Sequence, residues 1–240
     1  MTRPIIQSET GVTLVGGGPV TAPLLARALA RAPRIVAVDS GADRVLALGH
    51  QPEAVIGDLD SLSLAARHRL ADRLVPITEQ VTTDFDKALR SVDAPFVLAL
   101  GFAGARIDHG LAVLSTLVAH ADRTCLVLGP QDVVFHAPPR IELTLRAGDR
   151  LSLYPLAPVQ GDSIGLDWPI AGLDFAPDGR IGTSNRVTSG PVRLTMQGRG
   201  MLVILPRARL DAALTALRSA LRWPVRPDAA APWPTDARGG

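Results

Sequence analysis

Acidic residues follow two short apolar runs in the first quarter of this 240-residue chain. Asp39 comes after the run 35–38, and Asp58 and Asp60 come after the run 54–56. Both runs are bounded and rich in β-branched residues, which predicts buried strands. The carboxylates are therefore expected at strand ends, where open parallel α/β sheets bind ligands. Their oxygens suit a hard cation such as Mg²⁺, which usually arrives with phosphates.

The spacing of Asp58 and Asp60 sets a condition on this hypothesis. In extended chain they point to opposite sides, so they can share one ion only if the chain turns between them. Gly57 makes such a turn plausible. The alternative is an ordinary turn in which Asp60 or Ser61 caps the next helix. Taken alone, this stretch favours neither interpretation.

Glycines and basic residues follow other predicted strands. Gly16–Gly18 could bring backbone N–H groups to a phosphate, although a tight turn without a ligand explains them equally well. Lys87, the only lysine, and Arg106 could neutralise phosphate charge, and both also suit exposed helix ends. Asp108 precedes His109, but no nucleophile motif accompanies them, so a hydrolytic triad has little support. Taken alone, His109 is better explained as a helix-capping or core residue.

Strands and helices alternate over the first 130 residues. Strands are predicted at 12–15, 34–38, 54–56, 74–77, 95–100 and 123–128, with helices at 21–31, 42–48, 62–73 and 111–120. Thr83 is the expected N-cap of a further helix that begins with Asp84. The alternation predicts a parallel sheet with helices on both faces. Polar residues after five of the strands then meet at one edge, which favours a ligand site.

The pattern changes near Pro138. Apolar residues alternate with period two from residue 141, with frequent turn signals, which predicts an all-β module. The expected fold is α/β, with a Rossmann-like parallel-sheet domain over 11–137 and a C-terminal β-sandwich over 138–207. Residues 208–240 are predicted to form a short helix and a disordered, Pro/Ala/Gly-rich tail.

Two polar groups stand out in the β module. Trp168 lies between Asp167 and Pro169, and it is either core filling, the default for a tryptophan, or a flat stacking surface. Thr183, Ser184 and Asn185 offer compact hydrogen bonding, but they also suit a turn.

Composition excludes several classes of protein. The formal charge is +2 and no run of five like charges occurs, so a nucleic-acid partner is not expected. Cys125 is the only cysteine, which rules out an internal disulfide, and it is predicted to be a small buried apolar residue. The polar start MTRPIIQSET and the short apolar runs predict neither a signal peptide nor a membrane span. A cytoplasmic protein is expected.

Six motifs in order carry a resemblance to a known family. They are VDSGADR, VIGDLDSL, TDFDKAL, GARIDHGLA, GLDWPI and GTSNRV, and the resemblance spans about residues 12 to 205. In combination and spacing they resemble thiamine pyrophosphokinase. The resemblance implies an α/β catalytic domain that binds ATP and Mg²⁺, a β-sandwich that binds thiamine, and a homodimer with shared active sites. The implied reaction transfers a diphosphoryl group from ATP to the thiamine hydroxyl, giving thiamine diphosphate and AMP.

The resemblance also implies roles for individual residues. Four acidic positions match those that serve Mg²⁺ and the triphosphate: Asp39, Asp58, Asp60 and Asp84. Lys87 and Arg106 match positions near the nucleotide and complete, with Asp58, Asp60 and Asp84, the implied catalytic set. Further binding positions are Ser40, Gly41, Asp108 and His109. Trp168 matches the residue that stacks on thiamine, and Thr183, Ser184 and Asn185 match the thiamine pocket.

Four positions depart from the family pattern. Ser40 stands where the family often has Gly, Gly110 and Val113 stand where it often has Thr and Asn, and Asp167 replaces a frequent Lys. Two other functions are therefore weighed. A related diphosphokinase could act on another alcohol such as a pterin, but Trp168 with the GTSN motif favours thiamine. A sensor without turnover would have no need for the full set of carboxylates.

Overall fold

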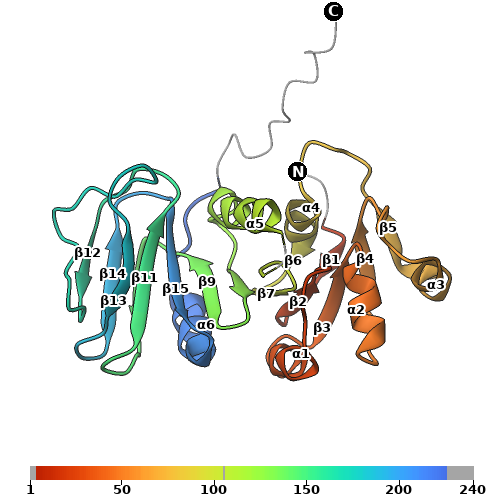
Figure 1. The fold of residues 1–240 in the computed structure, drawn as a ribbon, viewed down its shortest axis with the longest axis horizontal. Helices are drawn as coiled ribbons and strands as arrows, with labels where there is room; N and C mark the ends of the chain where they lie inside the picture. The colour runs from red at the N-terminus through yellow and green to blue at the C-terminus, as the bar shows by residue number, and fades with distance from the viewer. Residues whose placement is uncertain (1–3, 105, 226–240) are drawn as a thin grey trace, which may run out of the picture.

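Within residues 4–104 and 106–225, which this computed structural model describes, one ten-stranded sheet runs along the molecule (Figure 1). Its strand order is β13-β11-β15-β9-β8-β7-β2-β3-β4-β5. The bounds in chain order are β2 Val12–Val15, β3 Arg34–Val38, β4 Ala54–Gly57, β5 Leu74–Pro76, β7 Val97–Leu100, β8 Cys125–Leu128, β9 Asp132–His136, β11 Arg150–Pro155, β13 Gly182–Arg186 and β15 Met201–Pro206.

The sheet has a parallel and an antiparallel part. Strands β8, β7, β2, β3, β4 and β5 pair in parallel, and most of them are buried along their whole length. Strand β9 then pairs antiparallel with both β8 and β15, and β11 and β13 continue the antiparallel part. The sequence predicted a parallel sheet followed by a separate β module. The structure differs, because β9, a strand that the sequence analysis did not identify, joins both parts into one mixed sheet.

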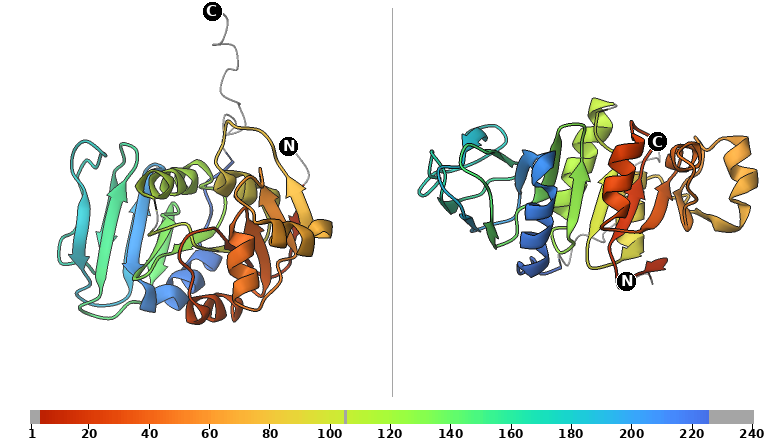
Figure 2. Two further views of the ribbon diagram at one scale, coloured as in Figure 1. Left: turned by 45° about the vertical axis from the view of Figure 1, so that its right-hand side comes forward. Right: turned by 90° about the horizontal axis from the view of Figure 1, so that it is seen from below.

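Helices cover both faces of the sheet (Figures 1 and 2). One apolar core contains residues of α1 (Ala22–Leu29), α2 (Gly41–Ala47), α3 (Leu64–Arg69) and α6 (Leu210–Ser219). A second core contains residues of α4 (Asp84–Ser91) and α5 (Ile107–Ala119). Since the sheet separates the two cores, its parallel strands are buried on both sides, which explains their continuous apolar runs.

A smaller antiparallel sheet packs on the β13–β11–β15 end of the large one. Its order is β10 (Arg140–Leu143), β14 (Val192–Met196) and β12 (Gly161–Ile164). Alternate residues of β14 are buried, and they share the first core with residues of β11 and β15. The period-two pattern after residue 141 therefore reflects a two-layered antiparallel arrangement, whose second layer is the end of the main sheet.

The remaining elements are short. Strands β1 (Ile6–Gln7) and β6 (Val92–Asp93) pair in parallel, and 3₁₀ turns occupy Ala71–Arg73 and Arg207–Arg209. Cys125 is buried, as predicted. The predicted closing helix is α6, whereas residues 226–240 of the predicted disordered tail lie outside the described residues. In the described part of the chain, no helix has the length and apolar character needed to cross a membrane.

The turn after β7 gives a test of the packing at the sheet edge. Gly101 has φ +76°, and a Cβ there would lie 2.5 Å from the carbonyl oxygen of Gly16. We expect Gly101→Ala to lower the free energy of unfolding by roughly 2 to 4 kcal/mol through backbone strain and steric overlap. Urea denaturation measures the change.

Gly110 provides the matched control, because it lies in α5 and a Cβ there meets no atom within 4 Å. Gly110→Ala should raise the free energy of unfolding by about 0.5–1 kcal/mol. Equal effects of the two substitutions would contradict the assigned geometry at Gly101.

Candidate active site

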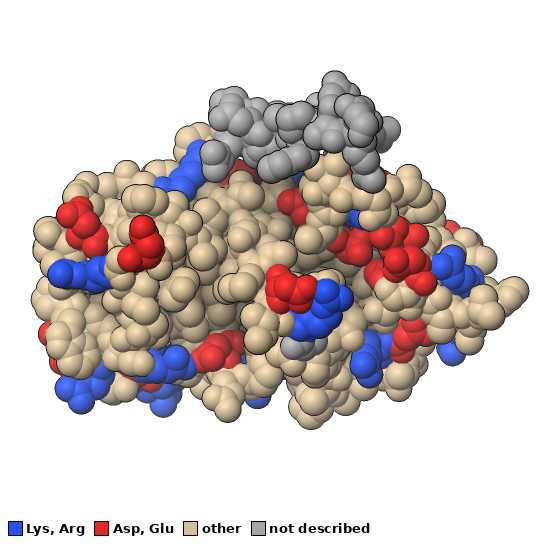
Figure 3. Space-filling view, turned by 45° about the horizontal axis from the view of Figure 1, so that its top comes forward, with Lys and Arg blue, Asp and Glu red and all other residues tan. Residues whose placement is uncertain are grey.

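A cavity of about 530 Å³ opens at the carboxyl ends of the parallel strands. Residues predicted from several separate motifs line it together: Gly16, Gly17, Gly18, Asp39, Ser40, Asp58, Asp60, Asp84, Lys87, Arg106 and His109. Figure 3 shows acidic side chains gathered on this face toward the right of the view, the end of the sheet that carries β4 and β5. Ligands in parallel α/β sheets bind at this edge.

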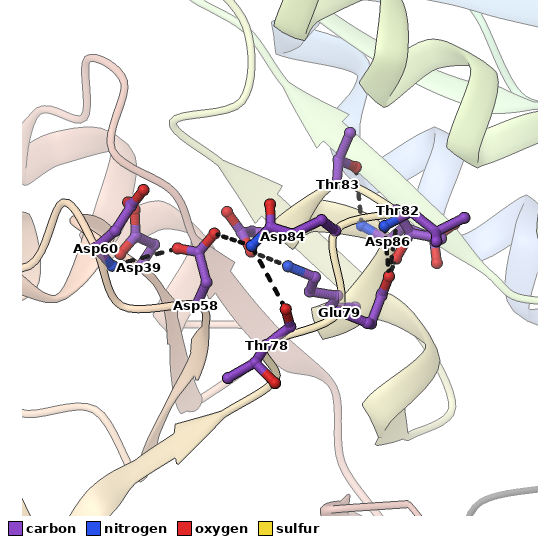
Figure 4. A network of polar contacts seen from close by, with 12 residues as sticks. Asp39, Asp58, Asp60, Thr78, Glu79, Thr82, Thr83, Asp84 and Asp86 are labelled. Carbon is purple, nitrogen blue, oxygen red and sulfur yellow. Dashed lines mark hydrogen bonds and ion pairs between the residues drawn. The ribbon is translucent and has the colours of Figure 1, made fainter. Parts of the chain in front are cut away.

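The chain turns between Asp58 and Asp60. Leu59 has φ +66°, and the backbone N–H of Asp60 donates to Asp58 Oδ1 at 3.2 Å. The turn brings both carboxylates to the same side, where oxygens of Asp39, Asp58 and Asp60 all lie within 4.8 Å of one another (Figure 4). The alternative that Asp60 or Ser61 caps the next helix is wrong. Helix α3 begins at Leu64, and its N-cap is Ser63.

Asp39 is the most buried member of this cluster. It follows β3 with φ +49° and is 8% exposed. Burial raises the pKa of its carboxyl group, a hydrogen bond from Ser61 at 2.5 Å opposes this, and the charges of Asp84 and Asp60 raise it further. Within the described residues, Asp39 Oδ1 is buried without a hydrogen-bond partner. An unpartnered oxygen among converging carboxylates fits a divalent cation.

Asp84 lies beside the three-carboxylate cluster rather than in it. It is the first residue of α4, whose N-cap Thr83 accepts a hydrogen bond from the backbone N–H of Asp86, as predicted. Lys87 Nζ donates to Asp84 Oδ1 at 3.0 Å, and Lys87 is only 1% exposed. The sequence indicated an exposed helix-end cation as one alternative for Lys87. The structure buries it instead, with its ammonium group paired to Asp84.

Close packing of the backbone requires glycine at several positions near the cavity. The N–H groups of Gly16 and Gly18 donate to backbone carbonyls at the end of β7, and a Cβ at Gly18 would lie 2.6 Å from the Gly101 oxygen. A Cβ at Gly41 would lie 1.9 Å from the carbonyl oxygen of Val15, and Gly41 is not among the residues that line the cavity. Two of the three N–H groups that could cradle a phosphate are thus used by the backbone, which favours the tight-turn interpretation.

The start of α5 presents charged groups at the rim of the cavity. Arg106 Nη2 lies 2.6 Å from Asp108 Oδ2, and both side chains are exposed. Arg106 and His109 line the cavity, whereas Asp108 does not. Val113, one of the departures from the family pattern, is buried on α5 and also lines the cavity. Arg106 therefore needs only to release an exposed partner to reach an anion.

Comparison with known proteins gives one family-model match. Residues 25–128 match the family model described as "Thiamin pyrophosphokinase, catalytic domain". No curated protein matches the sequence.

Solved thiamin pyrophosphokinase structures share the fold over a longer part of the chain. The Candida albicans enzyme aligns with TM-score 0.71 at 15% identity, covering 85% of this chain and 93% of its own. The yeast enzyme gives 0.69 at 17% identity, with 85% and 88% covered. The Geobacillus thermodenitrificans enzyme gives 0.67 at 22% identity, with 82% and 96% covered. The mixed α/β fold is thus that of thiamin pyrophosphokinases.

Outside residues 25–128, a second hollow of about 270 Å³ lies beside β13. Trp168, Thr183, Ser184 and Asn185 all line it, so the structure brings these predicted residues together. Trp168 is 59% exposed, which excludes the core-filling alternative. Thr183 and Ser184 are exposed on the strand, and Ser184 has φ +61°.

Asn185 differs from its neighbours because it is buried, at 5% exposure. Its Nδ2 donates to the carbonyl oxygen of Trp168 at 2.7 Å, and its Oδ1 accepts from the N–H groups of Trp168 and Arg186. Asn185 therefore fixes the backbone that presents Trp168. The adjacent departure, Asp167, forms an ion pair with Arg186, so its negative charge is neutralised locally.

Several cavity residues were not predicted from the sequence. Ser61 was considered only as a helix cap, although its position after Asp60 in the GDLDS segment could have suggested a contact with a carboxylate. Gln80, Thr82 and Phe102 also line the cavity. They carry no local sequence signal, because their place depends on how the segment between β5 and α4 and the end of β7 fold against neighbouring strands.

The role assigned to Asn185 can be tested by stability. Asn185→Ala leaves the buried polar groups of Trp168 without partners, so the free energy of unfolding should fall by about 1–3 kcal/mol. Thr183→Ala, on the same strand but exposed, should change it by less than about 0.5 kcal/mol. Denaturant titration compares the two variants, and similar losses would argue against the role of Asn185.

Proposed function

We propose that this protein is a thiamine diphosphokinase, which transfers the diphosphoryl group of ATP to the thiamine hydroxyl and releases AMP. The observation that carries the proposal is the convergence of Asp39, Asp58 and Asp60 at the sheet edge of a thiamin pyrophosphokinase catalytic domain. The unpartnered Oδ1 of Asp39 supports cation binding there. The aromatic hollow at Trp168 supports a planar acceptor.

The proposed division of work follows the two hollows. The carboxylates of Asp39, Asp58 and Asp60 would hold Mg²⁺, which when bound neutralises phosphate charge. Lys87 holds Asp84 beside them, and Arg106 turns from Asp108 to the triphosphate. The thiamine oxygen forms a bond to the β-phosphorus as the bond from that phosphorus to the α–β bridging oxygen breaks, and AMP leaves. A base takes the hydroxyl proton, and no residue is assigned to that role. The contribution of the chain is positioning and charge neutralisation.

The acceptor side and the assembly are part of the same proposal. Trp168 would stack on thiamine while Asn185 holds its backbone and Thr183 and Ser184 supply hydrogen bonds. The resemblance to the family supports a cytoplasmic homodimer with shared active sites, with residues 11–137 serving ATP and residues 138–207 serving thiamine. The exposed apolar side chains Ile107, Leu111 and Trp168 are consistent with surfaces that a second copy covers.

Nucleotide analysis tests the function directly. The protein is incubated with ATP and Mg²⁺, with and without thiamine, and the nucleotides are separated. AMP should form only when thiamine is present. Formation of ADP, or AMP that does not depend on thiamine, would refute the proposal. AMP formation with a pterin alcohol instead would support the alternative acceptor, and thiamine binding without AMP would support a sensor.

The metal site gives a second test. Asp60→Asn keeps the volume of the side chain but removes its charge, so diphosphoryl transfer should fall by about 100-fold or more. The free energy of unfolding should stay equal or rise, because a like charge leaves the cluster. Asp72→Asn changes an exposed aspartate remote from the cavity and serves as control. Unfolding of the Asp60 variant would show that the carboxylate serves the fold.

A further inference from the structure

A carboxylate that the proposed reaction does not use organises the loop between β5 and α4. Glu79 accepts hydrogen bonds from the backbone N–H groups of Val81 at 2.8 Å and Thr82 at 3.1 Å, and from the Thr82 hydroxyl (Figure 4). Burial alone would raise the pKa of Glu79, but the hydrogen bonds from Thr82, Val81 and Arg90 outweigh it and lower the pKa to about 2. The loop is thus folded around a charged carboxylate.

Arg90 connects this loop to the helix that carries Asp84. Its Nη2 lies 2.7 Å from Glu79 Oε1, and its Nη1 lies 4.0 Å from Asp86 Oδ1. The other Asp86 oxygen lies 3.0 Å from Nε2 of His120, the C-cap of α5. The Glu79 and Arg90 side chains are about one-third exposed, so the pair contributes little to global stability. Its effect is local, because it holds the loop against α4 in one conformation.

Gln80 extends from the loop between β5 and α4 to Asp58, one of the three clustered carboxylates. Its Nε2 donates to Asp58 Oδ2 at 3.3 Å and to the carbonyl oxygen of Thr78 at 3.5 Å. The other oxygen of Asp58 accepts from the N–H of Asp60. Both oxygens of Asp58 are therefore oriented, one by its own turn and one by the loop that Glu79 folds.

We propose that Glu79 and Arg90 are positioning residues, which act through Gln80 to orient the Asp58 carboxylate toward the bound cation. The inference rests on the proposed metal site. Hydrogen bonds to a ligating carboxylate orient it and tune its affinity, and their loss commonly costs 10- to 100-fold in metal affinity. Glu79 and Arg90 touch no reacting atom in this arrangement.

Two measurements that do not need turnover test the proposal. Mn²⁺ binding in the presence of a non-hydrolysable ATP analogue is titrated by electron paramagnetic resonance, and amide hydrogen exchange is followed at Val81 and Thr82. Glu79→Gln should weaken Mn²⁺ binding about tenfold and speed exchange at both amides. Gln80→Ala should weaken Mn²⁺ binding to a similar extent, about tenfold, and leave the exchange unchanged.

Controls make the result specific. Glu142→Gln makes the same chemical change in an exposed ion pair, with Arg193, far from the cavity, and should alter neither measurement. Arg90→Lys keeps the charge but loses the planar fork, so it should speed exchange and weaken Mn²⁺ binding. Arg90→Lys also replaces Glu79→Gln if circular dichroism shows that the latter does not fold.

The outcomes separate the proposals. Unchanged Mn²⁺ affinity in the Glu79 or the Gln80 variant overturns the positioning role, as does weaker binding in Glu79→Gln without faster exchange. An unmodified protein that binds no Mn²⁺ refutes the proposed metal site and with it any effect of the loop on that site. The exchange data then still report whether Glu79 folds the loop.

Discussion

Three carboxylates held within 4.8 Å of one another are the constraint on which this structure depends. At that separation, two negative charges repel by roughly 3 kcal/mol in a medium of effective dielectric constant near 20. The backbone that holds the carboxylates against this repulsion is strained. Asp39 and Leu59 both have positive φ, a conformation that costs free energy in residues other than glycine. The parallel strands fix where these residues leave the sheet. Such strain at a cluster of like charges is expected where a cation supplies the missing attraction.

Two basic residues near the three-carboxylate cluster, Lys87 and Arg106, have different surroundings. Lys87 is buried and paired with Asp84, so it offsets part of the negative charge that Asp84 adds beside the cluster, and the exposed cation Arg106 pairs elsewhere, with Asp108. A buried ammonium group is tolerated only with a close partner, so Lys87 and Asp84 fix each other. The cavity therefore has an acidic side at β3 and β4 and an exposed basic group, Arg106, at the start of α5.

Features that depend on neighbours in the chain were predicted from the sequence. The apolar runs gave the parallel strands, Thr83 was identified as a helix N-cap, and the turn required between Asp58 and Asp60 is present. Features that depend on distant contacts were not. The segment at β9 joins two parts of the sheet through pairing with β8 and β15, and no local pattern encodes that pairing. The hydrogen bonds between Asn185 and Trp168 join strand β13 to a segment 17 residues earlier in the chain, and Gln80 contacts Asp58 because their segments follow the neighbouring strands β5 and β4.

The strand β9 also limits how the molecule can move. Many enzymes that join two substrates rotate one lobe against another about a flexible hinge. Here, the carboxylate cluster and the hollow at Trp168 stand on one hydrogen-bonded sheet, and β9 and β15 are paired over five residues. Rotation between the two ends would break that ladder, at a cost on the order of several kcal/mol. The spacing of the two hollows within one chain is therefore a rigid dimension, and exclusion of water falls to surface loops that move on faster timescales.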